Sequence, residues 1–221
     1  MPIIGGAEPF LKTYDPVTGA RINNFRLSTT IGLSCYPTID GRVIWISRLT
    51  TQTVTPFYLE TETKGSTVAI GANPVGIWYS PTERLLWKIS AAGAISTVDM
   101  ETGTITDAIS LPVDVYKGLT GDSRFLWTLD LTTGSVKQVD RLLSTVVDGF
   151  TQPTDAADLH FDGRFLWIVT GAESIQGTIK QYDPFTGTEV GSFNITNYGL
   201  SSGPIGITGD GRFLYVTDLV Q

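Results

Sequence analysis

The side chains that could do chemistry are few, and they lie in irregular segments between apolar runs. They are carboxylates, amides, phenol rings and one imidazole, which together suit the recognition of sugar hydroxyls by hydrogen bonding and stacking. Each could equally be an ordinary loop residue that caps a turn. The candidate binding residues are Tyr36, Asp114, Tyr116, Asp155, Asp158, His160, Glu173, Asn197 and Tyr198.

His160 is the single histidine, and it stands where other segments of similar pattern place Thr38, Trp78, Thr120 and Thr208. This position falls on an innermost strand, so we expect the imidazole near a central channel. One interpretation is a catalytic or metal-binding group, and the other is a hydrogen-bonded structural histidine. A lone histidine excludes a histidine-rich metal site, and we expect neither a metal nor another cofactor.

Three aspartates, Asp114, Asp155 and Asp158, could supply paired carboxylates. A glycosidase needs two such groups roughly 5–10 Å apart, and acidic loops can also hold Ca²⁺. No recognisable motif accompanies these aspartates, and nucleophile-elbow, P-loop and dinucleotide patterns are absent from the sequence. We therefore predict no enzyme, no catalytic residues and a binding or structural role; a glycan hydrolase or lyase is the alternative.

Composition narrows the class of protein. The 221 residues are 41% hydrophobic and 17% charged, which indicates a globular chain, and 24 Gly and 11 Pro favour many short strands. The net charge of −7 without a basic cluster argues against nucleic acid as a partner. We expect a soluble protein of the cytoplasm or a virion, because neither a signal peptide nor an apolar run that would insert into a membrane is present.

The frame that positions these residues is a repeat. Residues 162–170 join a tight turn to a run of β-branched and aromatic residues. The same phrase contains an Arg at positions 42, 84, 124, 164 and 212, and Trp or Tyr follows each Arg three residues later. Intervals of 42, 40, 40 and 48 residues are typical of a β-propeller with four strands in each blade.

A second phrase, Tyr-Asp-Pro-x-Thr-Gly, occurs at residues 14–19 and 182–187, where a turn joins two strands. Near the N-terminus it has no first phrase before it, and the first phrase at 204–218 has no second phrase after it. We therefore predict that N-terminal strands pair with C-terminal strands and close the ring, which also covers strand edges. The prediction is one all-β domain over 1–221, a five-bladed β-propeller of four-stranded antiparallel blades at about 32–71, 74–112, 114–151, 155–196, and 203–221 plus 9–27.

The segments 204–207, Pro-Ile-Gly-Ile, and 215–218, Tyr-Val-Thr-Asp, together with the Asp-Pro-x-Thr-Gly turn, resemble the β-propeller repeat family named for its Tyr-Val-Thr-Asn motif. The resemblance covers most of the chain and implies the fold. It implies no single function, because such repeats occur in surface, scaffold and enzymatic proteins alike. Streptogramin lyases, propellers of similar repeat type, use a pair of histidines, whereas this chain has only His160.

Two faces follow from this fold. The Asp-Gly and Thr-Gly hairpins share one face, which we call the tight-turn face. Longer connections share the opposite, long-loop face, which we predict to bind the partner because function generally lies on such loops. The predicted partner is a protein in a larger assembly, such as a virion, or a surface glycan. A purely structural spacer remains a third possibility.

The five repeated arginines could form an anion-binding ring. The alternative is that each pairs locally with the aspartate two residues before it, which four of the five copies have, or packs its stem on the next blade. The sequence favours this structural interpretation. The residues in question are Arg42, Arg84, Arg124, Arg164 and Arg212.

Overall fold

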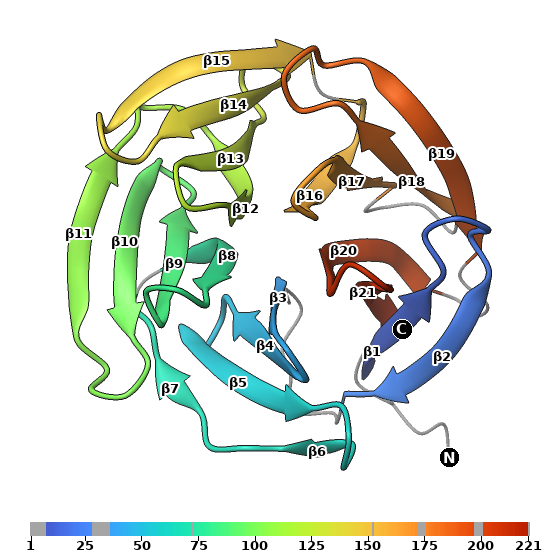
Figure 1. The fold of residues 1–221 in the computed structure, drawn as a ribbon. Coiled ribbons are helices and arrows are strands. Elements are labelled where there is room, and N and C mark those ends of the chain that lie inside the picture. Colours follow the sequence, from blue (N-terminus) through green and yellow to red (C-terminus); the bar gives the residue numbers. More distant parts are fainter. Residues whose placement is uncertain are drawn as a thin grey trace, which may run out of the picture.

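The computed structural model describes residues 8–27, 36–71, 73–151, 153–171, 176–196 and 201–220. Five antiparallel sheets stand around a central axis like the blades of a propeller (Figure 1). The described residues contain strands and turns but no helix, and so no helix that could cross a membrane. The predicted five-bladed β-propeller is confirmed.

Each blade runs from an innermost strand at the axis to an outermost strand at the rim (Figure 1). Blade one contains β3 (Pro37–Asp40), β4 (Val43–Arg48), β5 (Thr53–Tyr58) and an outer strand in two pieces, β6 (Thr63–Lys64) and β7 (Val68–Ala69). Blade two contains β8 (Pro74–Ser80), β9 (Leu85–Ser90), β10 (Ala94–Asp99) and β11 (Ile105–Ser110). Blade three contains β12 (Tyr116–Gly121), β13 (Phe125–Asp130), β14 (Ser135–Asp140) and β15 (Thr145–Thr151). Blade four contains β16 (Ala156–Phe161), β17 (Leu166–Thr170), β18 (Gln176–Tyr182) and β19 (Glu189–Thr196).

The fifth blade is composite. Its inner strands are β20 (Ser201–Gly209) and β21 (Leu214–Val220), and its outer strands are β1 (Glu8–Tyr14) and β2 (Arg21–Arg26). β1 pairs antiparallel with β21, with Thr13 opposite Tyr215. The two ends of the chain thus share one sheet, as the sequence predicted, and β21 does not present an open edge.

The first phrase is held by its aspartate. In blade four, Oδ1 of Asp162 accepts the backbone N–H groups of Arg164 and Phe165 at 2.8 and 2.7 Å. Its Oδ2 accepts the indole N–H of Trp167 at 2.7 Å. Asp210 repeats this arrangement with the hydroxyl of Tyr215 at 3.0 Å. One carboxylate therefore fixes both the turn and the aromatic ring that packs between blades.

Residues of the second phrase pack against the preceding blade. Tyr14 packs against Phe193 of blade four with ring centres 6.4 Å apart, and a side chain at Gly19 would collide with the same ring. Tyr182 and Gly187 hold Phe150 of blade three in the same way, with Tyr182 and Phe150 at 5.4 Å. The tyrosine and the glycine of the phrase thus recur because both contact one aromatic ring of the preceding blade.

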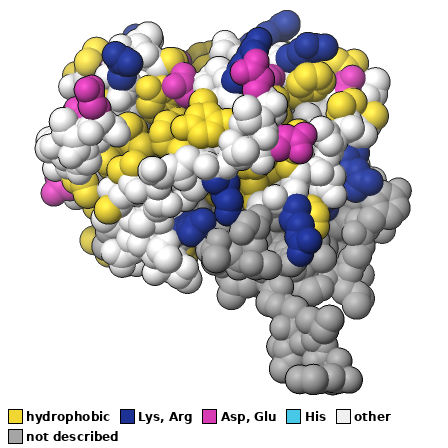
Figure 2. Space-filling view, turned by 90° about the horizontal axis from the view of Figure 1, so that it is seen from below, with side chains coloured by type: hydrophobic (Ala, Val, Ile, Leu, Met, Phe, Trp, Pro, Cys, Tyr) yellow, Lys and Arg dark blue, Asp and Glu magenta, His cyan; other side chains and the backbone are white. Residues whose placement is uncertain are grey.

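Apolar side chains fill the space between the blades. The repeated aromatics Trp87, Trp127, Trp167 and Tyr215 are buried, and Trp45 is partly buried. Burial of rings of this size contributes on the order of 2–3 kcal/mol each as an upper limit. On the side of the molecule seen in Figure 2, a central run of hydrophobic side chains is bordered by both acidic and basic ones.

Candidate functional site

The structure buries the two described tyrosines among the predicted site residues. Tyr116 is 2% exposed, and its hydroxyl donates to the carbonyl of Pro112 at 3.0 Å. Tyr36 belongs to the hydrophobic core between blades one and two. Both side chains therefore pack the start of an innermost strand and are out of reach of a surface partner in this conformation.

Asp158 is buried as well. Its Oδ2 accepts the backbone N–H of Ile207 in the composite blade at 2.9 Å. On the other side, a Cβ at Gly118 of blade three would lie 2.6 Å from Oδ1. Burial raises the pKa of this carboxyl to about 8, although the N–H groups of Ile207 and Leu159 act in the opposite direction. Asp158 thus lies buried among three innermost strands.

The remaining candidates divide between the surface and the undescribed part of the chain. Asp155 is exposed and has a positive φ of 59°, and Asp114 is half-buried. Glu173, Asn197 and Tyr198 lie outside the described residues. The nine predicted residues are therefore not brought together as one described site.

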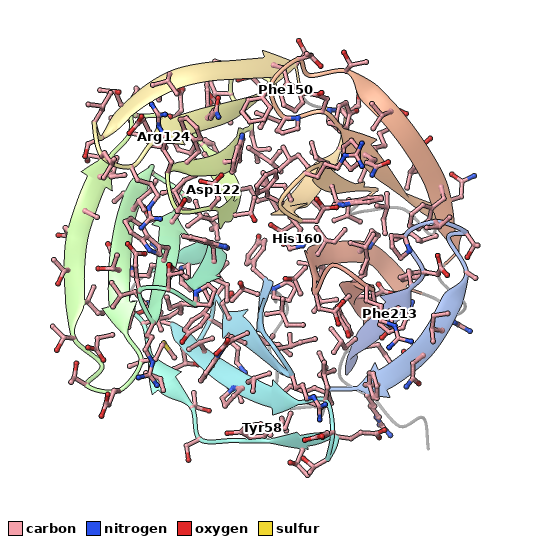
Figure 3. All side chains as sticks on the ribbon, in the orientation of Figure 1. Tyr58, Asp122, Arg124, Phe150, His160 and Phe213 are labelled. Atoms are coloured by element: carbon pink, nitrogen blue, oxygen red, sulfur yellow. The ribbon has the colours of Figure 1, made fainter. Side chains whose placement is uncertain are left out.

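His160 lies at the axis of the ring (Figure 3). It lines a cavity of about 280 Å³ together with residues from the ends of all five innermost strands. The strand ends in question lead into the tight-turn hairpins, so this cavity is the channel mouth on the tight-turn face. The sequence predicted that His160 is a binding residue near the channel and that the long-loop face is the binding face. The structure confirms that His160 lies at the channel but places it at the opposite, tight-turn end.

Residues at the channel mouth alternate between two kinds of contact with the next blade. The hydroxyl oxygen of Thr38 accepts the backbone N–H of Tyr79 at 2.9 Å, and that of Thr120 accepts the N–H of Phe161 at 3.0 Å. Trp78 and His160 are larger and instead press against glycine. A Cβ at Gly121 would lie 3.1 Å from the Trp78 ring, and a Cβ at Gly209 would lie 2.9 Å from Nε2 of His160.

This alternation explains the odd histidine. His160 is 9% exposed, and its Nε2 is buried without a hydrogen-bond partner among the described residues. Burial lowers the pKa of the imidazole to about 4, so the ring is neutral at pH 7. The sequence contained evidence of this packing. Each blade with a large residue at this position, Trp78 or His160, is followed by a blade with a Thr-Gly pair there, Thr120-Gly121 or Thr208-Gly209.

The channel mouth offers one carboxylate, that of Asp122, among its described lining residues. Oδ1 of Asp122 accepts the backbone N–H groups of Arg124 and Phe125 at 2.7 and 2.6 Å. Within the described ranges, no group of three or more His, Cys, Asp or Glu side chains is placed to hold a metal ion. Hydroxyls and aromatic rings therefore dominate the chemistry of this cavity.

A second hollow of about 560 Å³ opens between blade four and the composite blade. Its floor and walls include the rings of Phe165, Trp167 and Phe193, and Pro16 and Val17 come from the hairpin between β1 and β2. Arg164 lies at its edge. We call this hollow the inter-blade groove.

The repeated arginines differ in their partners. Arg42 forms an ion pair with Glu60, and Arg124 pairs with Asp140 at 3.3 Å. Arg124 also lies over the ring of Phe125 at 4.9 Å, and Arg164 and Arg212 stack likewise on Phe165 and Phe213, with the guanidinium carbon 4.7 Å from each ring centre. Of the two predicted alternatives, a side-chain ion pair with the aspartate two residues before is not formed by Arg124, Arg164 or Arg212 among the described residues. Oδ1 of Asp122, Asp162 and Asp210 instead accepts the backbone N–H of the arginine. Packing of the arginine stems on the next blade stays a prediction.

The long-loop face carries an apolar patch beside Asp114, formed by Val113, Val115 and Leu131. Val113 is 93% exposed on the connection between blades two and three. Several hydrogen bonds fasten this connection: Leu131 donates its N–H to the carbonyl of Val115 at 2.8 Å, and Val115 donates to the Thr132 hydroxyl at 3.1 Å. A fixed loop therefore presents two valines to solvent.

No protein-family model and no curated protein sequence matches this chain. Solved structures are similar in fold. A chain of the Kuenenia stuttgartiensis hydrazine synthase is 19% identical, with a TM-score of 0.57 over 87% of this chain and 57% of that chain. A chain of a nidogen/laminin complex is 14% identical, with a TM-score of 0.63 over 96% of this chain and 85% of that one. The chain thus spans little more than half of the first of these structures, and at these identities the similarity establishes a propeller fold and leaves membership of a repeat family as a prediction.

Proposed function

We propose that this propeller is a non-enzymatic binding platform that contacts a protein partner through the long-loop face, at the patch of Val113, Val115 and Leu131. The observation that carries the proposal is the fastened loop before β12. It holds Val113 and Val115 outside the core, although each would be stabilised by burial. A partner surface that covers them gains this apolar contact without first ordering the loop.

Precedent for a propeller in protein recognition comes from the similar chain in a nidogen/laminin complex. Asp114 and Asp155 border the same face, so the proposed partner is apolar at the contact and neutral or basic around it. A role in a virion and a glycan ligand remain predictions.

Cross-linking would test the proposal. A photo-reactive residue at position 113 should give an adduct with one co-purifying protein, and the same residue at Leu142, exposed on the tight-turn face, should not. The substitutions V113S and V115S together should remove the co-purifying protein without lowering the melting temperature. Equal adducts from both positions would contradict the proposal, and hits on a glycan array that survive V113S/V115S would favour the glycan.

The enzyme alternative predicts a pocket with two accessible carboxylates. In the described residues, the channel mouth has only Asp122, which is engaged with its own turn, and Asp158 is buried elsewhere. We therefore place the hydrolase or lyase second. Release of reducing sugar from a panel of polysaccharides, lost in D122N, would reverse this order.

A further inference from the structure

The inter-blade groove is the repeat equivalent of a site that is occupied by one of the chain's own side chains between blades two and three. Between blades two and three, Arg141 follows the turn aspartate Asp140 and inserts its side chain between the rings of Trp78 and Trp87. Its guanidinium lies 4.4 Å from the Trp87 ring centre and pairs with Glu83. Between blade four and the composite blade, the residue after the turn aspartate is Pro16, which is too short to reach the equivalent ring, and the space beside Trp167 stays open.

The two equivalent sites differ in the charged side chains that the chain places there. In the filled copy, the chain supplies both the cation, Arg141, and the anion, Glu83. In the open copy Pro16 and Gly163 stand at the positions of Arg141 and Glu83, so both charges of that pair are absent. The nearby Arg164 forms no ion pair among the described residues, and its guanidinium is stacked on Phe165. The carboxylate nearest in sequence, Asp162, is occupied by three N–H groups. No carboxylate of the described residues therefore pairs with the Arg164 guanidinium.

We propose that the inter-blade groove binds a short segment of a protein partner, with a large apolar side chain in the groove and an adjacent Asp or Glu carboxylate on Arg164. Stacking on Phe165 holds the guanidinium plane in place, so its N–H edge is available for a two-point contact with a carboxylate. Arg212 of the next blade, stacked likewise on Phe213, can receive a second carboxylate.

The groove favours a side chain over a sugar. A sugar ring stacks on an aromatic face that is open to solvent. Trp167 is only 5% exposed, and the Arg164 guanidinium covers one face of Phe165. The apolar wall is completed by Val17, which is 90% exposed at the tip of its hairpin and gains most from being covered.

The net charge of the chain limits how many acidic residues the bound segment can carry. At −7, the molecule as a whole repels a long acidic tract. A segment with one or two carboxylates beside its apolar side chain can pair with Arg164 and Arg212 and is repelled much less by the net negative charge. The site is thus separate from the long-loop patch in position and in the chemistry it selects.

Selection from random peptides displayed on phage tests the proposal with the full chain as bait. The enriched sequences should share Asp or Glu next to a large apolar residue. Their binding should fall about tenfold in R164Q, since a lost charge-assisted contact costs roughly 1.4 kcal/mol. The matched control is R42Q, which removes another exposed repeat arginine, in blade one, and should leave binding within about twofold.

Several results would overturn the inference. These are failure to enrich any peptide, enrichment of peptides without acidic residues, and equal binding to R164Q and the intact chain. Displacement of the peptides by N-acetylneuraminic acid at lower concentration than by a carboxylate-bearing dipeptide would assign the groove to an acidic sugar instead. Because V113S/V115S does not touch this groove, peptide binding should survive in it even if the long-loop proposal fails.

Discussion

Lys12 of β1 and Asp218 of β21 form an ion pair that is buried inside the composite blade, where segments from the two ends of the chain share a sheet. The two residues are 206 positions apart. Their side chains are almost completely excluded from solvent, so each charge depends on polar groups of the protein. Both this ion pair and the backbone hydrogen bonds between β1 and β21 therefore hold the ring closed.

Removing one partner should reveal this dependence. In K12M the charge of Asp218 loses its buried cation, and we expect the free energy of unfolding to fall by about 3–5 kcal/mol. The double substitution K12M/D218L replaces both charges with apolar groups and should recover part of the loss. Urea unfolding followed by fluorescence measures both values. A K12M protein as stable as the parent would show that the pair does not secure the closure.

Removal of the outer strands is a larger test of the same closure. Deleting residues 1–27 removes β1 and β2 and leaves β21 with an open edge. We expect a lower melting temperature and self-association through that edge, measured by calorimetry and by size-exclusion chromatography with light scattering. A truncated protein that melts cooperatively at the original temperature and stays monomeric would disprove the role of these strands.

The closure and the blades were predictable because both depend on local patterns. Asp-Gly turns, alternating apolar runs and the second phrase recur within the sequence itself, and each copy specifies its own hairpin. The second phrase at 14–19 has no first phrase before it, and the first phrase at 204–218 has no second phrase after it. Pairing of β1 with β21 was therefore the simplest arrangement. Local pattern also predicted the aromatic side chains between blades, since Trp127 and Trp167 stand in β13 and β17, which are buried along both sides.

The candidate site was much less predictable, because polarity does not reveal burial. Tyr116 and Asp158 have the composition of binding residues, but the packing of neighbouring innermost strands covers them. The open groove beside Trp167 is not visible in one repeat, and it appears only when Pro16 is compared with its counterpart Arg141 in the folded ring. That Arg164 has no ion-pair partner among the described residues is likewise a property of the folded ring.

Asp158 should make stability depend on pH. Burial raises the pKa of its carboxyl to about 8 in the folded state, above the ordinary value of 3.8 that applies when the chain is unfolded. Folding therefore favours the protonated acid, and this stabilisation, fully present below pH 3.8, is lost as pH rises toward 8. The slope is at most about 1.4 kcal/mol per pH unit. Chemical unfolding between pH 6.5 and 8 should show falling stability, and D158N should flatten the curve.

His160 should act at lower pH and in the opposite direction. Burial lowers the pKa of the imidazole from 6.5 to about 4, so the unfolded chain binds a proton first as the solution is acidified. The stability that the neutral ring contributes is present above pH 6.5 and is lost as pH falls toward 4. Between pH 6.5 and 4 Asp158 and His160 act in opposite directions, so acidification should stabilise H160Q relative to the parent, whereas D158N should lose stability more steeply than the parent. If the difference in stability between H160Q and the parent stays constant between pH 6.5 and 4, the imidazole does not contribute.

The alternation at the channel mouth gives a prediction about paired positions. In G209A the new methyl would lie 2.9 Å from Nε2 of His160 and 3.0 Å from the carbonyl oxygen of Phe213. Such crowding at a buried position costs about 1–3 kcal/mol. Replacing the imidazole with the residue that most other blades carry removes the first of these contacts, so H160T/G209A should be more stable than the sum of the two single changes predicts. Thermal unfolding of the four proteins in the cycle measures this coupling. A coupling of zero would mean that the imidazole does not crowd a side chain at position 209, and the cost of G209A would then come from the carbonyl oxygen of Phe213.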